Sequence, residues 1–330
     1  MFCEFGRALH FTVFGGGEGE DAGIIIDGLP AGDYVSLFEI REFMARRTAG
    51  RSSGFTNFRA EKKDDFAVVS GLVNDTTCGA PLCAMIPRGE EADDETDAPH
   101  QDPPSLLAAL CFGGGVCRQL LEKRNITVGA HIESIGQVQD KPFDPVAVSA
   151  DDLRDPGRYP FPTLNFGVGE TMQAQIDLVE KHGDTIGGVI EGGVIGLPGG
   201  YGGPIFDGIG NALSRLIFAL PGVTAVEFGA GFRAAKMKGS EHNDAFTVED
   251  DAVKTASNNA GGILGGISTG MPLLFRAAVE PPPLPPETES EDSDAEETTA
   301  CTVPSLVPVV ESVTAMTVLD LLLSERGPAK

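Results

Sequence analysis

The sequence predicts a single α+β domain. Short apolar runs typical of strands are interleaved with segments in which apolar residues recur at helical spacing. The chain has 330 residues, 41% of them hydrophobic, which is enough for a sizeable core. Since no linker-like change of composition comes before Pro281, we expect residues 1–280 to form one folded core.

Two patterns indicate the strands. Residues 23–27 (GIIID) form a continuous apolar run, as in a buried strand. Residues 126–132 place an apolar side chain at every second position, as in a strand with one buried face. With these two, strands are expected at 7–14, 23–27, 66–70, 82–86, 126–132, 185–195 and 223–228.

Helices are expected between the strands. Ser36 and Glu39 have the spacing of a capping box. The helix that they begin should end near Arg46 and Arg47, because cations suit the negative end of the helix dipole. Further helices are expected at 106–122, 171–182, 209–220 and 309–323.

Residues 281–300 differ in composition from the rest. They begin with a proline-rich run and continue with an acidic run, so we expect an extended or disordered insert. Residues 301–330 follow, and their helix should complete the core. A second acidic segment, 90–102, is expected to be solvated.

The charge balance excludes several classes of partner. The chain has 24 Lys and Arg against 49 Asp and Glu, a net charge of −25. A nucleic-acid protein needs a basic face, and an anionic membrane surface would repel this chain. The uncharged stretch 255–275 is interrupted by polar residues and glycines, and the N-terminus has no apolar signal-peptide core. We therefore expect a cytoplasmic protein.

General motifs for catalysis are missing from the sequence. There is no phosphate-binding loop of the G-x-x-x-x-G-K-[ST] type, no H-E-x-x-H and no G-x-S-x-G, and the five histidines do not cluster. The six cysteines lack zinc-ligand spacing, so we expect small buried thiols and no metal site.

Four longer segments are more specific. In chain order they are 24–32 (IIIDGLPAG), 44–51 (MARRTAGR), 239–246 (GSEHNDAF) and 257–270 (SNNAGGILGGISTG). Together they resemble the chorismate synthase family. Shorter segments that support the resemblance are 183–188 (GDTIGG), 203–207 (GPIFD), 226–232 (VEFGAGF), 307–311 (VPVVE) and 319–323 (LDLLL). The resemblance extends from about residue 11 to residue 323.

This resemblance implies a β-α-β sandwich that assembles into a homotetramer. It also implies an anti 1,4-elimination of phosphate from 5-enolpyruvylshikimate 3-phosphate. The product is chorismate, an intermediate of the shikimate pathway to aromatic amino acids. The implied cofactor is reduced FMN, with NADPH as a candidate reductant.

The resemblance also suggests binding residues. Arg47 matches a family arginine that binds the phosphorylated substrate or a nicotinamide, and Arg51 lies near a second such position. The alternative for Arg46, Arg47 and Arg51 is a solvated helix end. Matches to the flavin-facing backbone are Asn259, Ala260, Gly265 and Gly266, for which the alternative is turn residues that pack a core.

The sequence departs from the family pattern near its histidines. Residues 14–19 (FGGGEG) match the family's F-G-E-S-H-G, so Glu18 stands where the family has a catalytic histidine. In 97–102 (DAPHQD), His100 is the candidate for a second family histidine, found in R-P-G-H-A-D. The family's following R-G-G-G loop has no counterpart before residue 106.

Basic residues are also missing. The family's K-P-T is here Glu280-Pro281-Pro282, and no Lys or Arg lies between Arg276 and Arg326. Two unit charges about 4 Å apart, at an effective dielectric constant of about 20, interact by about 4 kcal/mol, so glutamate would repel a phosphate that lysine attracts. Two interpretations remain. In one, the chain is an active enzyme whose cations come from another subunit or from basic residues 46–63. In the other, it is a non-catalytic homologue that acts as an oligomeric or partner-binding scaffold.

Overall fold

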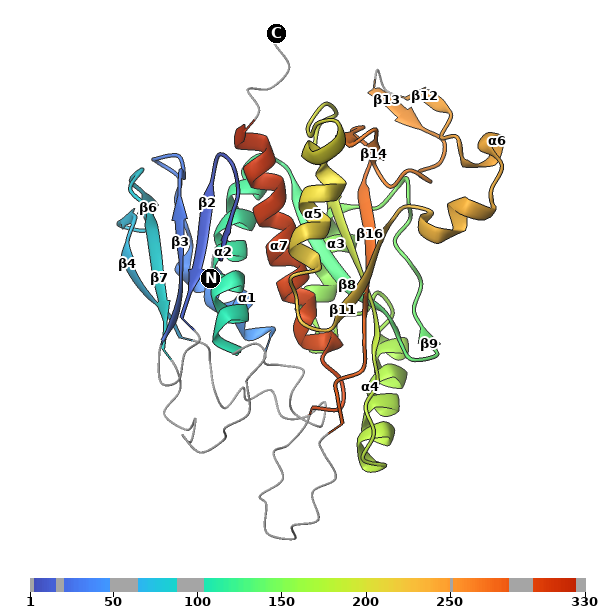
Figure 1. Ribbon diagram of the computed structural model, residues 1–330, viewed down its shortest axis with the longest axis horizontal. Helices are drawn as coiled ribbons and strands as arrows, with labels where there is room; N and C mark the ends of the chain where they lie inside the picture. The colour runs from blue at the N-terminus through green and yellow to red at the C-terminus, as the bar shows by residue number, and fades with distance from the viewer. Residues whose placement is uncertain are drawn as a thin grey trace.

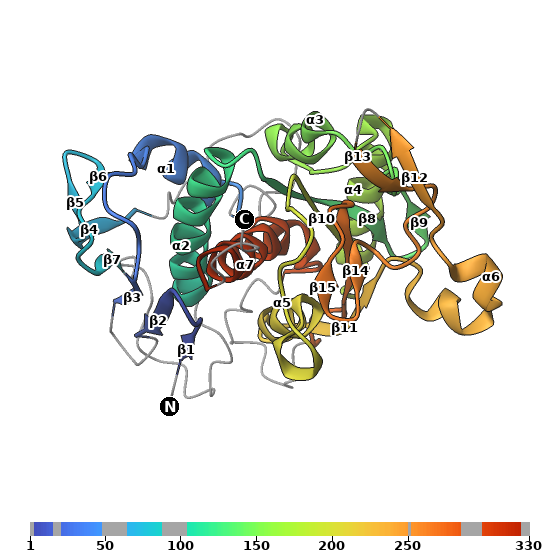
Figure 2. The same ribbon diagram turned by 90° about the horizontal axis from the view of Figure 1, so that it is seen from above.

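A computed structural model describes residues 3–15, 21–47, 65–87, 104–249, 252–284 and 299–324. In these residues a layer of helices lies between two antiparallel sheets (Figure 1). The same three layers are visible from above (Figure 2). The predicted α+β class is therefore confirmed.

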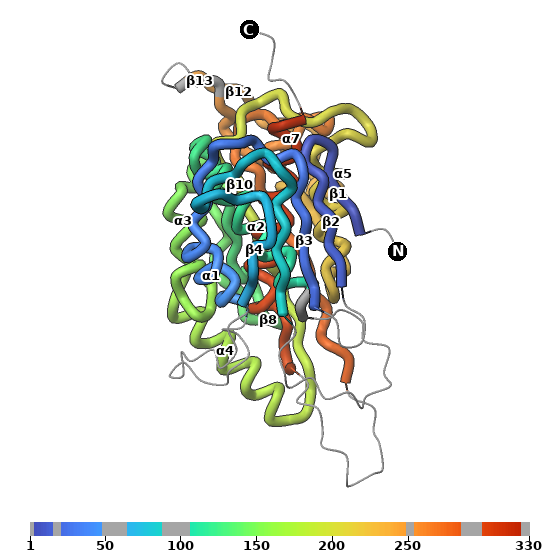
Figure 3. The backbone as a smooth tube through the Cα atoms, turned by 90° about the vertical axis from the view of Figure 1, so that its left-hand side faces the viewer, coloured from blue at the N-terminus to red at the C-terminus, as the bar shows by residue number. Residues whose placement is uncertain are grey.

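The first sheet has the strand order β1-β2-β3-β7-β4 and is seen side-on in Figure 1 and from its outer side in Figure 3. Its strands are β1 (Glu4–Phe5), β2 (His10–Phe14), β3 (Ala22–Asp27), β4 (Ala67–Ser70) and β7 (Leu82–Ile86). The predicted strand at 7–14 starts too early. Arg7, Ala8 and Leu9 donate their backbone N–H groups to the Asp320 carboxylate, at 2.8–3.1 Å, and not to a neighbouring strand.

The second sheet has the order β11-β16-β10-β8-β9. Its strands are β8 (Thr127–Ile135), β9 (Val138–Gln139), β10 (Gly188–Ile195), β11 (Val223–Phe228) and β16 (Leu273–Val279). The expectation of one buried face for β8 is wrong, because nearly all of its residues are buried. Its outer face is covered by α3 (Ala150–Arg154) and by Phe143, whose ring centroid lies 4.5 Å from that of His131.

The helical layer contains α1 (Leu37–Ala45), α2 (Pro104–Glu122), α5 (Ile209–Ile217) and α7 (Val303–Ser324). The N-cap of α1 is Ser36, as predicted, and it accepts a hydrogen bond from the Glu39 backbone. The Ser36 N–H donates to the side-chain oxygen of Gln119 on α2. In a capping box this N–H would instead donate to the Glu39 side chain. Helix α5 ends three residues earlier than expected.

The remaining elements lie outside this layer or at its edges. They are α4 (Phe166–Lys181), α6 (Gly239–His242), the 3-10 turns η2 (Asp155–Arg158), η3 (Ile205–Asp207) and η4 (Gly231–Lys236), and the short strands β5 (Leu72–Val73), β6 (Thr76–Thr77), β12 (Phe246–Glu249), β13 (Ala252–Thr255), β14 (Ile263–Leu264) and β15 (Ile267–Ser268).

Helices α2 and α7 pack in close contact at the centre of the molecule. A Cβ atom at Gly114 would lie 2.2 Å from the Cβ atom of Ser312, so only glycine allows this approach. The glycines at 113–115 therefore do not break α2; at least Gly114 is needed for its packing.

Helix α7 begins at Val303, six residues before the predicted start. Pro308 lies inside it, and the Ser312 hydroxyl donates to the Pro308 carbonyl at 2.7 Å. Among the described helices, α7 alone is long and apolar enough to cross a membrane, and most of its side chains are buried inside the protein.

A buried carboxylate on α7 holds two arginines. Glu311, 2% exposed, accepts hydrogen bonds from both terminal nitrogens of Arg46 at 2.7 and 2.8 Å, and lies 3.7 Å from Arg118. Burial alone would lower the pKa of Arg46, but the Glu311 charge and hydrogen bonds raise it. The alternative of a solvated helix end is thus wrong for Arg46.

The cysteines agree with expectation only in part. Cys111, Cys117 and Cys301 are buried free thiols, and burial raises the pKa of Cys301 to about 11. Cys3 and Cys78 are exposed.

Removing Glu311 should destabilise the protein strongly. Glu311→Ala leaves the Arg46 and Arg118 guanidinium groups buried without their carboxylate, which should lower the free energy of unfolding by about 3–5 kcal/mol. The matched control is Arg158→Ala, which removes an exposed ion pair to Asp155 and should change stability by less than about 1 kcal/mol. Urea unfolding followed by circular dichroism measures both, and equal losses in the two variants would contradict this role of Glu311.

Candidate functional site

The predicted flavin-facing residues lie in a compact turn before β16. The Asn258 side chain fixes this turn by donating to the Pro145 and Pro272 carbonyls at 2.8 Å and accepting from the Gly262 N–H at 2.7 Å. Gly261 has a φ of +64°, and a Cβ atom there would lie 2.4 Å from the Gly229 nitrogen. The turn is therefore a rigid part of the second sheet's border.

Asp244 is the central polar residue of this turn. Its carboxylate accepts hydrogen bonds from the Ser257 hydroxyl at 2.6 Å and from the Asn259 and Ala260 N–H groups at 2.8 and 2.9 Å. Burial acts to raise the pKa of Asp244, but these hydrogen bonds outweigh burial and the pKa is lowered. Asp244 lies in the quoted segment 239–246, but the sequence alone did not identify it as a site residue.

The backbone amides of Asn259 and Ala260 are used inside the protein, by Asp244. The Asn259 carbonyl also accepts from the Ala230 N–H at 2.8 Å. Gly266 packs, since a Cβ atom there would lie 2.5 Å from the Gly203 carbonyl oxygen. Around Gly265, in contrast, no atom of the described residues lies within 4 Å of such a Cβ. Gly265 therefore fits an open backbone surface and Gly266 fits the core-packing alternative.

Arg47 lies directly after α1. Its backbone N–H bonds the Met44 carbonyl at 3.0 Å, and the residue is only 4% exposed. A solvated helix end is thus wrong for Arg47 as well. Arg51, His100 and Glu18 lie outside the described residues.

Arg47 and the Asn259–Ala260 turn do not lie together within one chain. Helix α1 packs on α2, on the side of the first sheet, whereas the turn lies beside β11 and β16 of the second sheet. Figure 2 shows α1 beside α2, away from the second sheet, and the β14–β15 hairpin at the second sheet. Arg47 and the Asn259–Ala260 turn are therefore separated in a single copy.

The described residues of one chain do not make a complete flavin site. Glu280, in the position matched to a phosphate-binding lysine, donates its N–H to the Gly222 carbonyl at 2.8 Å. Next to it, the Pro282 carbonyl accepts from the Thr185 hydroxyl at 2.7 Å. These are uncharged backbone contacts beside an acidic side chain, and the amides of the Asn259–Ala260 turn are already bonded to Asp244. Neither arrangement fits a flavin phosphate.

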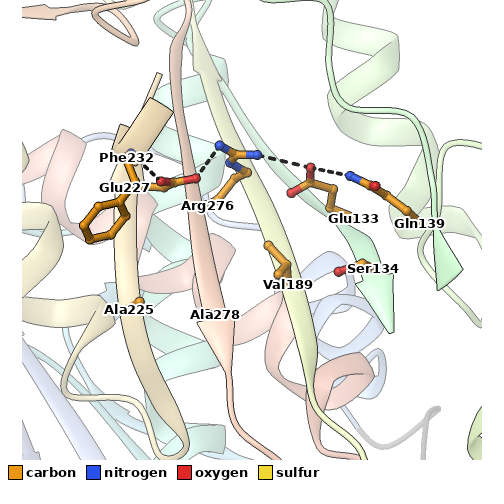
Figure 4. Close-up of a pocket in the computed structure, with 9 residues that line it drawn as sticks. All are labelled: Glu133, Ser134, Gln139, Val189, Ala225, Glu227, Phe232, Arg276 and Ala278. Carbon is orange, nitrogen blue, oxygen red and sulfur yellow. Dashed lines mark hydrogen bonds and ion pairs between the residues drawn. The ribbon is translucent and has the colours of Figure 1, made fainter. Parts of the chain in front are cut away.

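A separate hollow of about 220 Å³ lies on the outer face of the second sheet (Figure 4). A row of charged groups crosses it. Arg276 bridges Glu227 in a close ion pair and Glu133 at 3.5 Å. Glu227 accepts from the Phe232 N–H at 2.9 Å. Burial raises the pKa of Glu133. None of the predicted site residues that the structure describes lines this hollow.

A buried polar pair lies next to the hollow on the same face. The His131 Nε2 is 2.8 Å from a Glu191 carboxylate oxygen, which also accepts from the Phe143 N–H at 2.7 Å. The His131 Nδ1 faces the Ile132 carbonyl at 3.2 Å. Both residues are satisfied inside the fold, so we assign them a structural role. In the described part of the chain, no group of three or more His, Cys, Asp or Glu residues could hold a metal ion.

Comparisons with known proteins agree along the chain. The family model described as chorismate synthase matches residues 9–100 and 106–323. The chorismate synthase of Thermococcus gammatolerans is 35% identical, over 98% of this chain and 98% of its own length. That of Korarchaeum cryptofilum is 34% identical with the same coverage. A solved structure titled as a crystal structure of chorismate synthase has a TM-score of 0.80 and 26% identity, covering 98% of this chain and 94% of that one.

Replacing Asp244 should loosen the turn and change its response to acid. The pKa of Asp244 in the folded protein lies below the ordinary 3.8. The stabilisation from its hydrogen bonds is therefore fully present above pH 3.8 and is lost as the pH falls through the lower pKa of the folded state. Asp244→Asn should cost about 1–3 kcal/mol at neutral pH, because three donors lose a charged acceptor.

Urea unfolding between pH 6 and pH 3 measures this effect. The wild type should lose stability more steeply than Asp244→Asn below about pH 4. Glu170→Gln, an exposed carboxylate on α4, is the control and should stay close to the wild type. Parallel curves for wild type and Asp244→Asn would rule out the linkage.

Proposed function

The chain belongs to the chorismate synthase family, and we propose that it converts 5-enolpyruvylshikimate 3-phosphate to chorismate. The observation that carries this proposal is the family match over both long blocks of the chain, supported by relatives that are similar over almost their full length. In the reaction, a C–O bond to phosphate and a C–H bond on the opposite face are broken, a new C=C bond forms, and phosphate and a proton are released.

Arg47 is the described residue that we assign to substrate binding. A buried guanidinium can bind a phosphate or carboxylate through two parallel hydrogen bonds, which are stronger in a site that excludes water. We infer the same role for Arg51, or binding of NADPH as the flavin reductant, and acid–base chemistry for His100.

Members of the family use a reduced flavin, and we propose reduced FMN as the cofactor of this chain. The described residues of one chain do not complete its site, and Arg47 is separated from the Asn259–Ala260 turn. We therefore propose that the site is assembled only in a homotetramer in the cytoplasm, where a second copy and basic residues within 46–63 supply the missing cations. The net charge of −25 makes such local cations necessary for a dianionic substrate.

Chorismate formation tests this function directly. Purified protein, with its fold checked by circular dichroism, is incubated anaerobically with the substrate and chemically reduced FMN. We expect chorismate, and we expect Arg47→Ala to lower kcat/KM about 10- to 100-fold, the loss of one charge-assisted hydrogen-bonding group.

Two further variants keep this test interpretable. Arg47→Lys retains the charge and should recover part of the activity if Arg47 binds an anion. Arg158→Ala, at an exposed arginine on η2, should keep the wild-type kcat/KM. No chorismate from the folded wild type would instead support the non-catalytic interpretation of the sequence.

A further inference from the structure

We propose that the outer face of the second sheet, at the hollow crossed by Arg276, is the surface on which a second copy of this chain docks. The inference deepens the homotetramer proposed above and rests on it for the existence of an oligomer. It adds where two copies meet and which side chains carry the contact.

The outer face of the second sheet is covered over only part of the length of its strands. Near Gly129 of β8 and Gly193 of β10, the side chains of Phe143, Val148, Leu153 and Leu274 form a small apolar cluster on this face. At the other end of the strands the floor consists of Ser134, Val189, Ala278 and Ala225, which lie side by side on β8, β10, β16 and β11. The floor of the hollow is therefore a shallow, mainly apolar surface at the edge of a packed layer.

Phe232 supplies the complementary shape. It lies at the rim of the same hollow, on the β11 side, and is 81% exposed (Figure 4). Its position is fixed, because its N–H is bonded to Glu227 and the neighbouring Gly231, at a φ of +51°, packs against the same carboxylate. Exposed aromatic side chains such as this one, on a fixed backbone, are enriched in protein interfaces. Its ring is small enough to enter a hollow of about 220 Å³.

Charge complementarity favours a second copy of this chain. The hollow holds two carboxylates, Glu133 and Glu227, against one guanidinium, Arg276. Beside Phe232, the turn η4 presents Arg233 and Lys236, both exposed, with no carboxylate partner among the described residues. Since the whole chain carries −25, most other pairings of its surface would be repulsive.

A two-fold axis between two copies would match Phe232 with the hollow and the cations of η4 with its carboxylates at the same time. The same surface carries a projecting group, Phe232 and Arg233, and a receiving surface, which is the floor of the hollow with the Glu133 and Glu227 carboxylates. In an isologous dimer each projecting group would enter the receiving surface of the other copy, so every contact is made twice. A partner of different sequence would need to reproduce both halves.

The first test measures mass in solution. Sedimentation equilibrium of the full chain should show association of the wild type, and Phe232→Ser should weaken it about 100-fold or more, because two aromatic side chains lose their burial. The control is Phe38→Ser, at a residue that is 71% exposed on α1, away from the second sheet, which should leave association unchanged. Because a tetramer also has a second interface, the expected result is a drop in mass from tetramer to dimer, and a mass for Phe232→Ser equal to that of the wild type overturns the proposal.

The second test places the contact. In a Cys3→Ser, Cys78→Ser background, protein carrying Phe232→Cys is mixed with differently tagged protein carrying Ala278→Cys, and mild oxidation should join the two tags. Phe38→Cys mixed with Ala278→Cys should give no such product. Absence of the Phe232–Ala278 product from associated protein also overturns the proposal. Neither test uses chorismate formation, so an active protein with a different interface and an inactive protein with this interface remain distinguishable.

Discussion

Two carboxylates on α7 hold the first sheet and the helical layer together. Asp320 binds three consecutive N–H groups at Arg7, Ala8 and Leu9, and Glu311 binds the guanidinium groups of Arg46 and Arg118. Each is buried in an otherwise uncharged helix, where an ionised carboxylate is costly unless all its partners are in place. The start of β2 and the end of α1 are therefore both positioned by the last helix, and Arg47 is placed by the same contact that fixes Arg46.

Local pattern predicted most of the elements and failed where distant residues decide. The strands at 23–27 and 223–228 were predicted closely, because short runs of mainly apolar residues between turn residues are typical of strands. The strand that begins at His10 was predicted too early, because the groups that occupy the N–H donors before it are more than 300 residues away. The second buried face of β8 was missed because α3, a separate segment, covers it. The first six residues of α7 were missed because a proline usually marks a helix boundary, whereas this helix continues through Pro308 with the loss of one backbone hydrogen bond.

The sequence predicted which residues belong to the candidate site, but not what surrounds them in the fold. Motif matching selected Asn259 and Ala260, but it could not show that Asp244 already occupies both of their amides. It also selected Arg47 without showing that the residue is buried. The hollow at Arg276 was not predicted, because its residues come from β8, β9, β10, β11, β16 and η4, which meet only in the folded sheet. Arg51, His100 and Glu18 lie outside the described residues and stay predictions.

The distance along the chain between Asp320 and its donors has a consequence for biosynthesis. At about 5–20 residues per second, roughly 15–60 s separate the synthesis of Leu9 from that of Asp320. During that interval the first sheet lacks its anchor on α7, and the apolar face of α2 that packs on α7 has no partner. The nascent chain thus exposes an unfinished core for most of its translation. The negative charge of the chain would make such intermediates repel one another. The same charge that weakens anion binding would thus reduce aggregation before α7 is made.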